Sequence, residues 1–444
     1  TRSLVDYDED FTVAGLTAPV EIVRNNDNVP HIFGASDEDV FFALGFAHAQ
    51  DRLWQMTMLR RTAQGRLSEL FGPATLKTDE LLRRLDLYGL ALTSVKAQDP
   101  ATLKALEAYS AGVNAWINEV NAGARGRGAP EFFLFSNEIA AWAPADSIAI
   151  LKLMALQLSS AAETEVLRAR LSLILPPERL ADILPDDPSQ GIAALPDYAS
   201  VVPGVEPLMR PVDFAQGTLS PVADLGQAGA SNSWAAMPER SAAGGSLLAN
   251  DPHLGLTAPS IWYLARLELS GGGVIGGTIP GVPVILVGRS ETMGWGLTTA
   301  YVDDQDIVIE ELNPDNPEEY RTPTGWASFE SRESIITVKD AEPVTLKLRW
   351  SKNGPILPGG HYDLGSITPD GHVAALSWTA LSGADTSLSG AMALMKAKAI
   401  PEALAAGKLV IAPAQNVMLA DETGIALKVM GAIPARDAGH PTMG

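Results

Sequence analysis

The chain has 444 residues, of which 46% are apolar, enough to build a sizeable hydrophobic core. Its formal net charge of −21 would repel nucleic acid and anionic membranes, and no basic patch offsets this charge, so neither is an expected partner. Cysteine is absent, which excludes disulfides, thiolate metal sites and cysteine nucleophiles.

Residues 1–196 form a predicted helical region. Apolar residues recur at three- and four-residue spacing along three segments, which predicts helices over 37–70, 101–120 and 146–174. The predicted N-terminal caps of these helices are Asp37, Asp99 and Asp146. Two short strands interrupt the helical pattern, and they are predicted on either side of an asparagine-rich turn, over 20–23 and 31–33.

The longest apolar stretch, residues 153–162, lies inside the third of these helices. Lys152 and Glu163 bound it, and it is too short to cross a bilayer, so the sequence predicts no membrane span. Residue 1 is Thr rather than Met, which indicates that an upstream segment has been removed. On this basis the protein is expected to be periplasmic or secreted.

Residues 197–230 are a predicted linker, because prolines and glycines break any period there, and such a stretch is a natural place for proteolysis. Residues 231–444 are a predicted strand-rich region. Its strands are expected over 233–237, 246–250, 263–269, 282–287, 307–312, 335–338, 344–350, 373–378, 416–420 and 425–430, and its helices over 387–398 and 401–406. Helices first and strands later indicate an α+β fold in which helices cover stacked sheets.

Ser231 opens the strand-rich region and is the candidate catalytic residue. A serine hydroxyl is a weak nucleophile until a base accepts its proton. Cleavage of the chain just before Ser231 would supply that base, because the new α-amine titrates at about pH 7.7–8.0. One residue would then hold both nucleophile and base. The alternative is an ordinary serine hydrolase that uses His253 as its base and needs no cleavage.

The residues around Ser231 belong to a series of motifs that extends over nearly the whole chain. They comprise Ser231-Asn232-Ser233-Trp234 and the segments 29–32, 45–56, 65–69, 248–254, 280–283, 295–296 and 415–416. In this order they resemble the penicillin acylase family of N-terminal nucleophile hydrolases, which includes penicillin and cephalosporin acylases and acyl-homoserine lactone acylases. The resemblance implies a four-layer αββα sandwich. It also implies self-cleavage into α and β pieces that remain together as a heterodimer.

Residue by residue, the resemblance implies that Ser231 is the nucleophile and that its freed amine is the base. His253 matches a residue whose backbone carbonyl, and in some members whose imidazole, contacts the nucleophile. The side-chain amide of Asn416 and the backbone N–H of Thr299 would bind the oxyanion. Arg436 matches an arginine that would keep the amine neutral by like-charge repulsion. Without the resemblance, His253 is interpreted as a packing residue, Asn416 as part of a turn and Arg436 as a surface residue.

The run Asp303-Asp304-Gln305-Asp306 indicates a second kind of site. Carboxylates this close repel one another unless they are solvated or bind a hard cation such as calcium, which takes about six to eight oxygen ligands. The resemblance implies a structural calcium ion held by Asp303, Asp306, the carbonyl of Gln305 and Glu165. A solvated acidic turn is the alternative interpretation. No cofactor is expected for catalysis.

Four positions match the acyl pocket of the family: Leu254, Leu286, Val287 and Ser159. Phenylacetyl-preferring members have aromatic residues there, whereas aliphatic and small side chains leave room for a longer acyl chain, in which each buried CH₂ contributes about 0.8 kcal/mol. The resemblance therefore implies a hydrolase of small N-acyl amides, with acyl-homoserine lactones ahead of penicillins and cephalosporins. A non-catalytic binding protein on the same scaffold is the rival interpretation.

Two departures from the family pattern are visible. Ala230 stands before the nucleophile where the family usually has Gly, and a side chain at this strained turn would slow self-cleavage. Family members also continue beyond the position that matches Gly444. The region 231–444 is therefore expected to be a truncated β-chain, or to have its remainder in another piece.

Overall fold

The computed structural model describes residues 3, 5–123, 127–135, 139–183, 231–255 and 257–436. The predicted linker, 197–230, lies outside the described residues. Before it, eight helices are described: α1 Asp37–Ala63, α2 Ser68–Phe71, α3 Leu76–Leu85, α4 Leu87–Ser94, α5 Pro100–Asn121, α6 Pro144–Leu158, α7 Ala161–Ser172 and α8 Pro177–Ile183. Two strands precede them, β1 Glu21–Arg24 and β2 Pro30–Phe33.

The helix boundaries differ from the sequence prediction for local reasons. The cap of α1 is Ser36, whose side chain accepts a hydrogen bond from the Asp39 N–H, rather than Asp37. The same helix ends at Ala63, just before Gly65 with its positive φ of 61°. Asp99 does cap α5, by accepting from two backbone N–H groups. The predicted helix over 146–174 is two helices, α6 and α7, because the backbone becomes extended at Ser159.

Residues after the linker form most of three sheets. The strands are β3 Asn232–Ala236, β4 Leu247–Asp251, β5 Tyr263–Leu269, β6 Gly272–Thr278, β7 Val287–Arg289, β8 Met293–Thr299, β9 Gln305–Asn313, β10 Asn316–Thr322, β11 Gly325–Ser328, β12 Glu330–Ile336, β13 Val344–Ser351, β14 Gly354–Leu357, β15 His372–Trp378, β16 Gln415–Asp421 and β17 Gly424–Met430. Two helices lie among them, α10 Ser387–Lys396 and α11 Ile400–Ala406.

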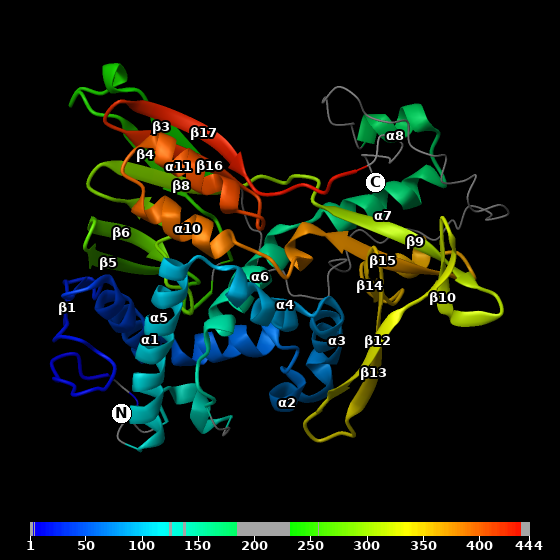
Figure 1. Cartoon of the computed structure of the whole chain (residues 1–444), viewed down its shortest axis with the longest axis horizontal. Helices are drawn as coiled ribbons and strands as arrows, with labels where there is room; N and C mark the ends of the chain where they lie inside the picture. The colour runs from blue at the N-terminus through cyan, green and yellow to red at the C-terminus, as the bar shows by residue number, and fades with distance from the viewer. Residues whose placement is uncertain are drawn as a thin grey trace.

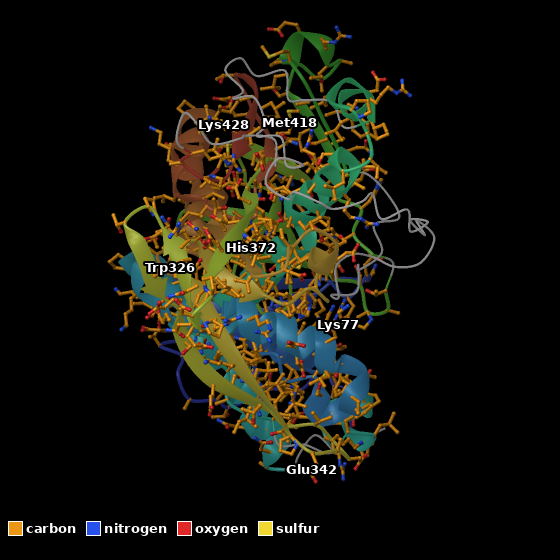
Figure 2. The ribbon with its side chains drawn as sticks, turned by 90° about the vertical axis from the view of Figure 1, so that its right-hand side faces the viewer. Lys77, Trp326, Glu342, His372, Met418 and Lys428 are labelled. Carbon is orange, nitrogen blue, oxygen red and sulfur yellow. The ribbon has the colours of Figure 1, made fainter. Side chains whose placement is uncertain are left out.

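The strand order brings segments from before and after the predicted linker into one sheet. An eight-stranded sheet has the order β1-β2-β5-β6-β7-β8-β16-β17, a seven-stranded sheet has the order β11-β10-β9-β15-β14-β13-β12, and β3 pairs with β4 alone. In Figure 1 the eight-stranded sheet lies at the left and the seven-stranded sheet at the right. Figure 2 shows Met418 and Lys428 of the first sheet at one end of the molecule and Glu342, between β12 and β13, at the other.

The layers around the eight-stranded sheet follow from the alternation of its side chains. On one face Gly296 of β8 meets Asn250 of β4, so the β3-β4 hairpin covers this face. On the other face Leu297 of β8 and Val417 of β16 share a cavity wall with Leu394 of α10. The order helix, sheet, sheet supplies three layers of the expected sandwich, and the predicted α+β class is confirmed.

Two predictions at this sheet are wrong. The predicted strand over 282–287 is a loop as far as Leu286, since the close prolines at 280 and 283 leave few ladder donors. The strand β8 lies in a segment without a predicted strand, because Gly294 and Gly296 interrupt its apolar alternation. Gly296 is required there, since a Cβ would lie 2.7 Å from Cβ of Asn250.

The helical core depends on one close crossing of α1 and α5. A Cβ placed at Gly112 would lie 1.8 Å from the carbonyl oxygen of Phe42, and one at Gly45 would lie 2.1 Å from that of Tyr109. The crossing also buries His48, whose Nδ1 is 2.7 Å from the Tyr109 hydroxyl. Burial, with a smaller contribution from the charge of Arg52, lowers the pKa of His48 to about 3, so this histidine is a neutral packing residue.

One helical segment of the described chain, Pro144–Ser172, is long and apolar enough, by length and composition alone, to cross a bilayer. It consists of α6 and α7, and 67% of its apolar window is buried inside the fold. Burial of this kind is typical of a core helix, because neighbouring elements occupy the surface that lipid would cover.

Gly112→Ala is expected to lower the free energy of unfolding by about 3 kcal/mol, because the methyl group must push the α1 backbone away. Urea unfolding followed by circular dichroism measures this change. The control is Gly245→Ala, in an exposed turn with no atom within 4 Å of the added Cβ, which should change stability by less than about 0.5 kcal/mol. Equal stabilities of the two variants would contradict the tight crossing.

Candidate active site

Ser231 lies immediately before β3, partly buried, at the start of the β3-β4 hairpin. The hairpin pairs Asn232 with Asp251, so the residues that follow β4 return to the serine. The backbone N–H of His253 donates to Ser231 Oγ at 3.2 Å. The hairpin therefore holds the serine hydroxyl through the backbone of a residue 22 positions away.

Asn250 ties this hairpin to the eight-stranded sheet. Its Nδ2 donates to the carbonyl oxygens of Asn232, at 2.8 Å, and Leu297, at 3.0 Å. Its Oδ1 accepts from the Leu297 N–H at 3.2 Å. One amide side chain thus fixes the residue next to Ser231 relative to β8. The motif 248–254 contains Asn250, but only the packing of the hairpin on β8 reveals this function.

The imidazole of His253 points to an acidic neighbour. Its Nε2 lies 3.0 Å from Asp251 Oδ2, and both side chains are about half exposed, at 46% and 49%. The contact between His253 and Ser231 is made by the backbone N–H, whereas the resemblance implies a carbonyl or imidazole contact. This arrangement gives no support to His253 as the base of an ordinary serine hydrolase.

Thr299 and Asn416 lie side by side at the ends of β8 and β16. The register pairs Gln415 with Thr299 and Asn416 with Thr298. Asn416 Nδ2 donates to Thr298 Oγ1 at 3.1 Å and to the Thr299 carbonyl at 3.2 Å. Asn416 shares the sheet face of Thr298 and Gly296, on which the β3-β4 hairpin lies. Their role at an oxyanion stays a prediction.

An apolar cavity opens beside Ser231. The cavity has a volume of about 120 Å³. Ser231 and Thr299 belong to its wall, as do Leu254 and Leu286, two of the four positions expected to line an acyl pocket. The remaining wall is largely aliphatic, from Leu151, Met154, Leu158, Ile279, Val284, Ile285, Leu297, Ala391, Leu394, Val410, Ala412, Val417 and Met430.

The other two expected lining positions are not among the residues of this wall. Val287 is the first residue of β7, and its side chain lies near Gly277. Ser159 follows the last residue of α6, and its Oγ donates to Asp304 Oδ1 at 2.8 Å instead of facing the cavity. Leu158 takes the wall position.

Several wall residues escaped the sequence analysis. Leu151, Met154 and Leu158 have the spacing of one helical face, and Trp262 precedes a predicted strand. The periodicity was visible, but an apolar helical face is the same whether it packs against a core or lines a cavity. Only the tertiary structure, which places α6 around the same cavity as α10 and the ends of β8 and β16, distinguishes the two.

The acidic run does form a cluster with α7. Carboxylate oxygens of Glu165, Asp303 and Asp306 all lie within 4.8 Å of one another. Arg436 joins them, with Nη1 at 3.1 Å from Asp303 Oδ2 and Nη2 at 2.9 Å from Asp306 Oδ1. Burial and the neighbouring aspartates raise the pKa of Glu165 well above its usual value, and burial likewise raises that of Asp303.

The polar side chains next to this cluster make hydrogen bonds to other parts of the fold. The Gln305 side chain accepts from the Ala162 N–H at 2.8 Å, which leaves its backbone carbonyl as the group expected at the cation. Asp304 accepts from Ser159 and from the Trp378 indole N–H, at 3.0 Å. The described contacts of Arg436 all go to the acidic cluster, so they lend no support to its expected role at the Ser231 amine.

Helices thus cover stacked sheets, and a serine lies at the wall of an apolar cavity. Comparison with known proteins identifies the family to which such a chain belongs. The family model described as penicillin amidase matches residues 19–443. The chain belongs to the penicillin amidase family.

Individual relatives have different names. The chain is 30% identical to the acyl-homoserine lactone acylase QuiP of Pseudomonas aeruginosa, over 96% of this chain and 51% of the relative. It is 30% identical to the penicillin acylase 2 proenzyme of Pseudomonas sp. strain SE83, over 81% of this chain and 46% of the relative. Its identity to the penicillin G acylase of Escherichia coli is 27%, over 77% and 46%. The chain thus spans about half the length of these relatives.

Among solved structures, the thermostable penicillin G acylase of Alcaligenes faecalis is 26% identical over 47% of this chain and 36% of that chain, with a TM-score of 0.42.

Asn250→Ala is expected to lower the free energy of unfolding by about 2–4 kcal/mol, because three backbone groups lose their partner. Urea unfolding followed by tryptophan fluorescence measures this loss. Asn26→Ala, in an exposed turn, is the control and should change stability by less than about 0.5 kcal/mol. If Asn250→Ala were as stable as the control, Asn250 would not anchor the hairpin.

Proposed function

We propose that this chain is a self-processing amidohydrolase whose nucleophile is Ser231, freed as a new N-terminus by cleavage after Ala230. The observation that carries the proposal is the position of the Ser231 hydroxyl. It is held by the His253 N–H at the wall of an apolar cavity, where a bound acyl chain would present its carbonyl carbon. Membership of the penicillin amidase family supports the same chemistry.

The proposed reaction has two steps. The Ser231 amine takes the hydroxyl proton as Oγ attacks the amide carbon, and it then gives this proton to the departing nitrogen, so the C–N bond breaks and an ester on Ser231 remains. Water, activated by the same amine, then cleaves the ester to a carboxylic acid. The Thr299 N–H and the Asn416 amide would stabilise the oxyanion. Because both Asn416 amide hydrogens have acceptors, the substrate oxygen would replace one of them.

We propose an aliphatic acyl group as the preferred substrate portion. The wall contains five polar residues, Ser231, Thr298, Thr299, Ser387 and Gln415, and is otherwise mainly aliphatic. A flexible acyl chain gains by burial against such a wall, at about 0.8 kcal/mol for each CH₂ group. Acyl-homoserine lactones are therefore placed ahead of penicillins, consistent with the name of the QuiP relatives.

Both pieces of a cleaved chain would contribute to this site, which favours a heterodimer of the two. The cavity wall takes Leu151, Met154 and Leu158 from before the predicted linker and the remainder from after it. In addition β2 pairs in parallel with β5, so the sheet itself contains strands from both pieces. Separation of the pieces would expose this wall and break the sheet.

Purified full chain is expected to show two masses that divide between Ala230 and Ser231, and to release amine from decanoyl-homoserine lactone faster than from penicillin G. Intact-mass spectrometry and an amine-release assay measure the two results. Ser231→Ala should remain a single chain without turnover, because it lacks both nucleophile and N-terminal serine.

Three outcomes would count against the proposal. Turnover by an uncut chain would favour the ordinary serine hydrolase, and an uncut, inactive parent would favour the binding-protein interpretation. Faster cleavage of penicillin G would contradict the aliphatic preference. Ser233→Ala is a matched control, since it removes a nearby hydroxyl at 3.4 Å from the Ala249 carbonyl and should leave both cleavage and turnover in place.

We also propose that the acidic cluster binds one structural calcium ion. Hard carboxylate oxygens from Glu165, Asp303 and Asp306 suit calcium, and the pairing of the Arg436 guanidinium with the two aspartates supports a preference of this cluster for positive charge. The ion would link α7 to the start of β9 and would compete with Arg436 for the aspartates. It would have no part in the chemistry at Ser231.

Calcium chloride at millimolar concentration is expected to raise the Tm by a few degrees relative to EDTA, since a ligand at a hundredfold excess over its Kd contributes about 2.7 kcal/mol. Differential scanning calorimetry measures this. Asp306→Asn should abolish the calcium response, whereas Arg436→Met should enlarge it by removing the competitor. Asp315→Asn, in an exposed turn, is the control that should respond like the parent. A parent without a calcium-dependent Tm would rule out the site.

A further inference from the structure

A buried lysine of the helical region reaches the loop that precedes α10. Lys152 lies on α6 and is 1% exposed. Its Nζ donates to the carbonyl oxygens of Ala380, at 2.8 Å, and Ser382, at 3.1 Å, and it pairs with Asp385 Oδ2 at 2.9 Å. All three ammonium hydrogens are therefore used on one loop.

Asp385 connects the Lys152 side chain to a residue of the cavity wall. Its Oδ1 accepts from the backbone N–H of Ser387, at 2.9 Å, and from the Ser387 hydroxyl, at 2.5 Å. The Ser387 oxygen in turn accepts from the N–H groups of Ile411, at 2.9 Å, and Ala412, at 3.1 Å. Ser387 and Ala412 both line the cavity beside Ser231.

A chain of buried polar contacts thus runs from α6 to the segment that closes the cavity. Ser387 and Asp385 are 7% and 5% exposed, so these bonds are shielded from water. A buried ion pair of this kind adds little net stability compared with apolar residues of the same size, because both charges lose their hydration. Its effect is instead on geometry, since the donors and acceptors permit one arrangement of the loop.

We propose that Lys152, Asp385 and Ser387 are positioning residues that set the acyl-binding wall at residues 410–413. The inference rests on the proposed function and adds to it that the acyl site is adjusted from the helical piece, across the predicted cleavage point. Asn416 is held separately, by Thr298 and Thr299 of β8. Loss of these buried polar contacts should therefore weaken acyl binding and leave the chemical step largely intact.

Kinetics with decanoyl-homoserine lactone test whether acyl binding changes while the chemical step does not. Ser387→Ala leaves the two N–H groups of residues 411 and 412 without an acceptor, and KM is expected to rise about tenfold with kcat within about twofold. Two double variants without buried charge form a matched pair. Lys152→Met with Asp385→Asn loses the lysine contacts but keeps an oxygen acceptor for Ser387, so its KM should rise less than that of Lys152→Met with Asp385→Leu, which should behave like Ser387→Ala.

Calorimetric titration with decanoate separates this inference from the proposed function. Decanoate affinity should fall about tenfold in Ser387→Ala and in the double variant that carries Asp385→Leu, and stay at the parent value in the exposed-lysine control Lys408→Met. A parent that binds decanoate without turnover would refute the proposed function and leave the inference standing. The inference fails if the parent binds no decanoate, if the two double variants have equal affinity, or if kcat falls while KM is unchanged.

Discussion

The sheet that carries the site depends on pairing between segments far apart in the chain. β2 pairs in parallel with β5, and its partner β1 forms the edge of the same eight-stranded sheet. Arg24 of β1 pairs with Asp51 of α1 at 2.9 Å, and Tyr263 of β5 donates to the same carboxylate at 2.6 Å. Because these groups are mostly buried, the Tyr263 hydroxyl of the strand-rich region depends on a carboxylate of the helical region for its hydrogen bond. The two regions therefore form one structure.

The second constraint is the alternation of side chains along β8 and β16. Leu297, Thr299 and Val417 face the helices and line the cavity, while Gly296 and Asn416 face the β3-β4 hairpin. Ser231 begins that hairpin and also reaches the cavity wall. An apolar cavity wall and the polar Asn416 side chain thus lie within one or two residues of each other on the same strands.

The distribution of charge does not follow the division of the chain into a helical and a strand-rich region. The chain carries 53 acidic residues, and the cluster of Glu165, Asp303 and Asp306 concentrates three of them where burial raises the pKa of Glu165 and Asp303. Arg436 compensates part of this charge. The arginine expected at the nucleophile therefore contacts the acidic cluster instead, where its charge offsets part of the charge between α7 and β9.

Much of the fold and site was predictable from local patterns. Helical periodicity and the Asp99 cap predicted α5, the change to alternating residues predicted an α+β chain, and the motif at Ser231 identified the family. Gly294 and Gly296 concealed β8, because the reason for glycine at 296 is the side chain of Asn250 in another element. The end of α6 decided that Leu158 rather than Ser159 faces the cavity.

The amino-acid sequence by itself determined most of the helices and many of the strands, and it marked Ser231, because propensity, periodicity and motif spacing act over a few residues. Only the tertiary structure decided that Arg436 meets the acidic cluster and that Lys152 pairs with Asp385, 233 residues away. Such pairings depend on distances through space that no local pattern encodes. A buried lysine in an apolar helix has the same sequence signature whether its partner is water, a carboxylate or a substrate.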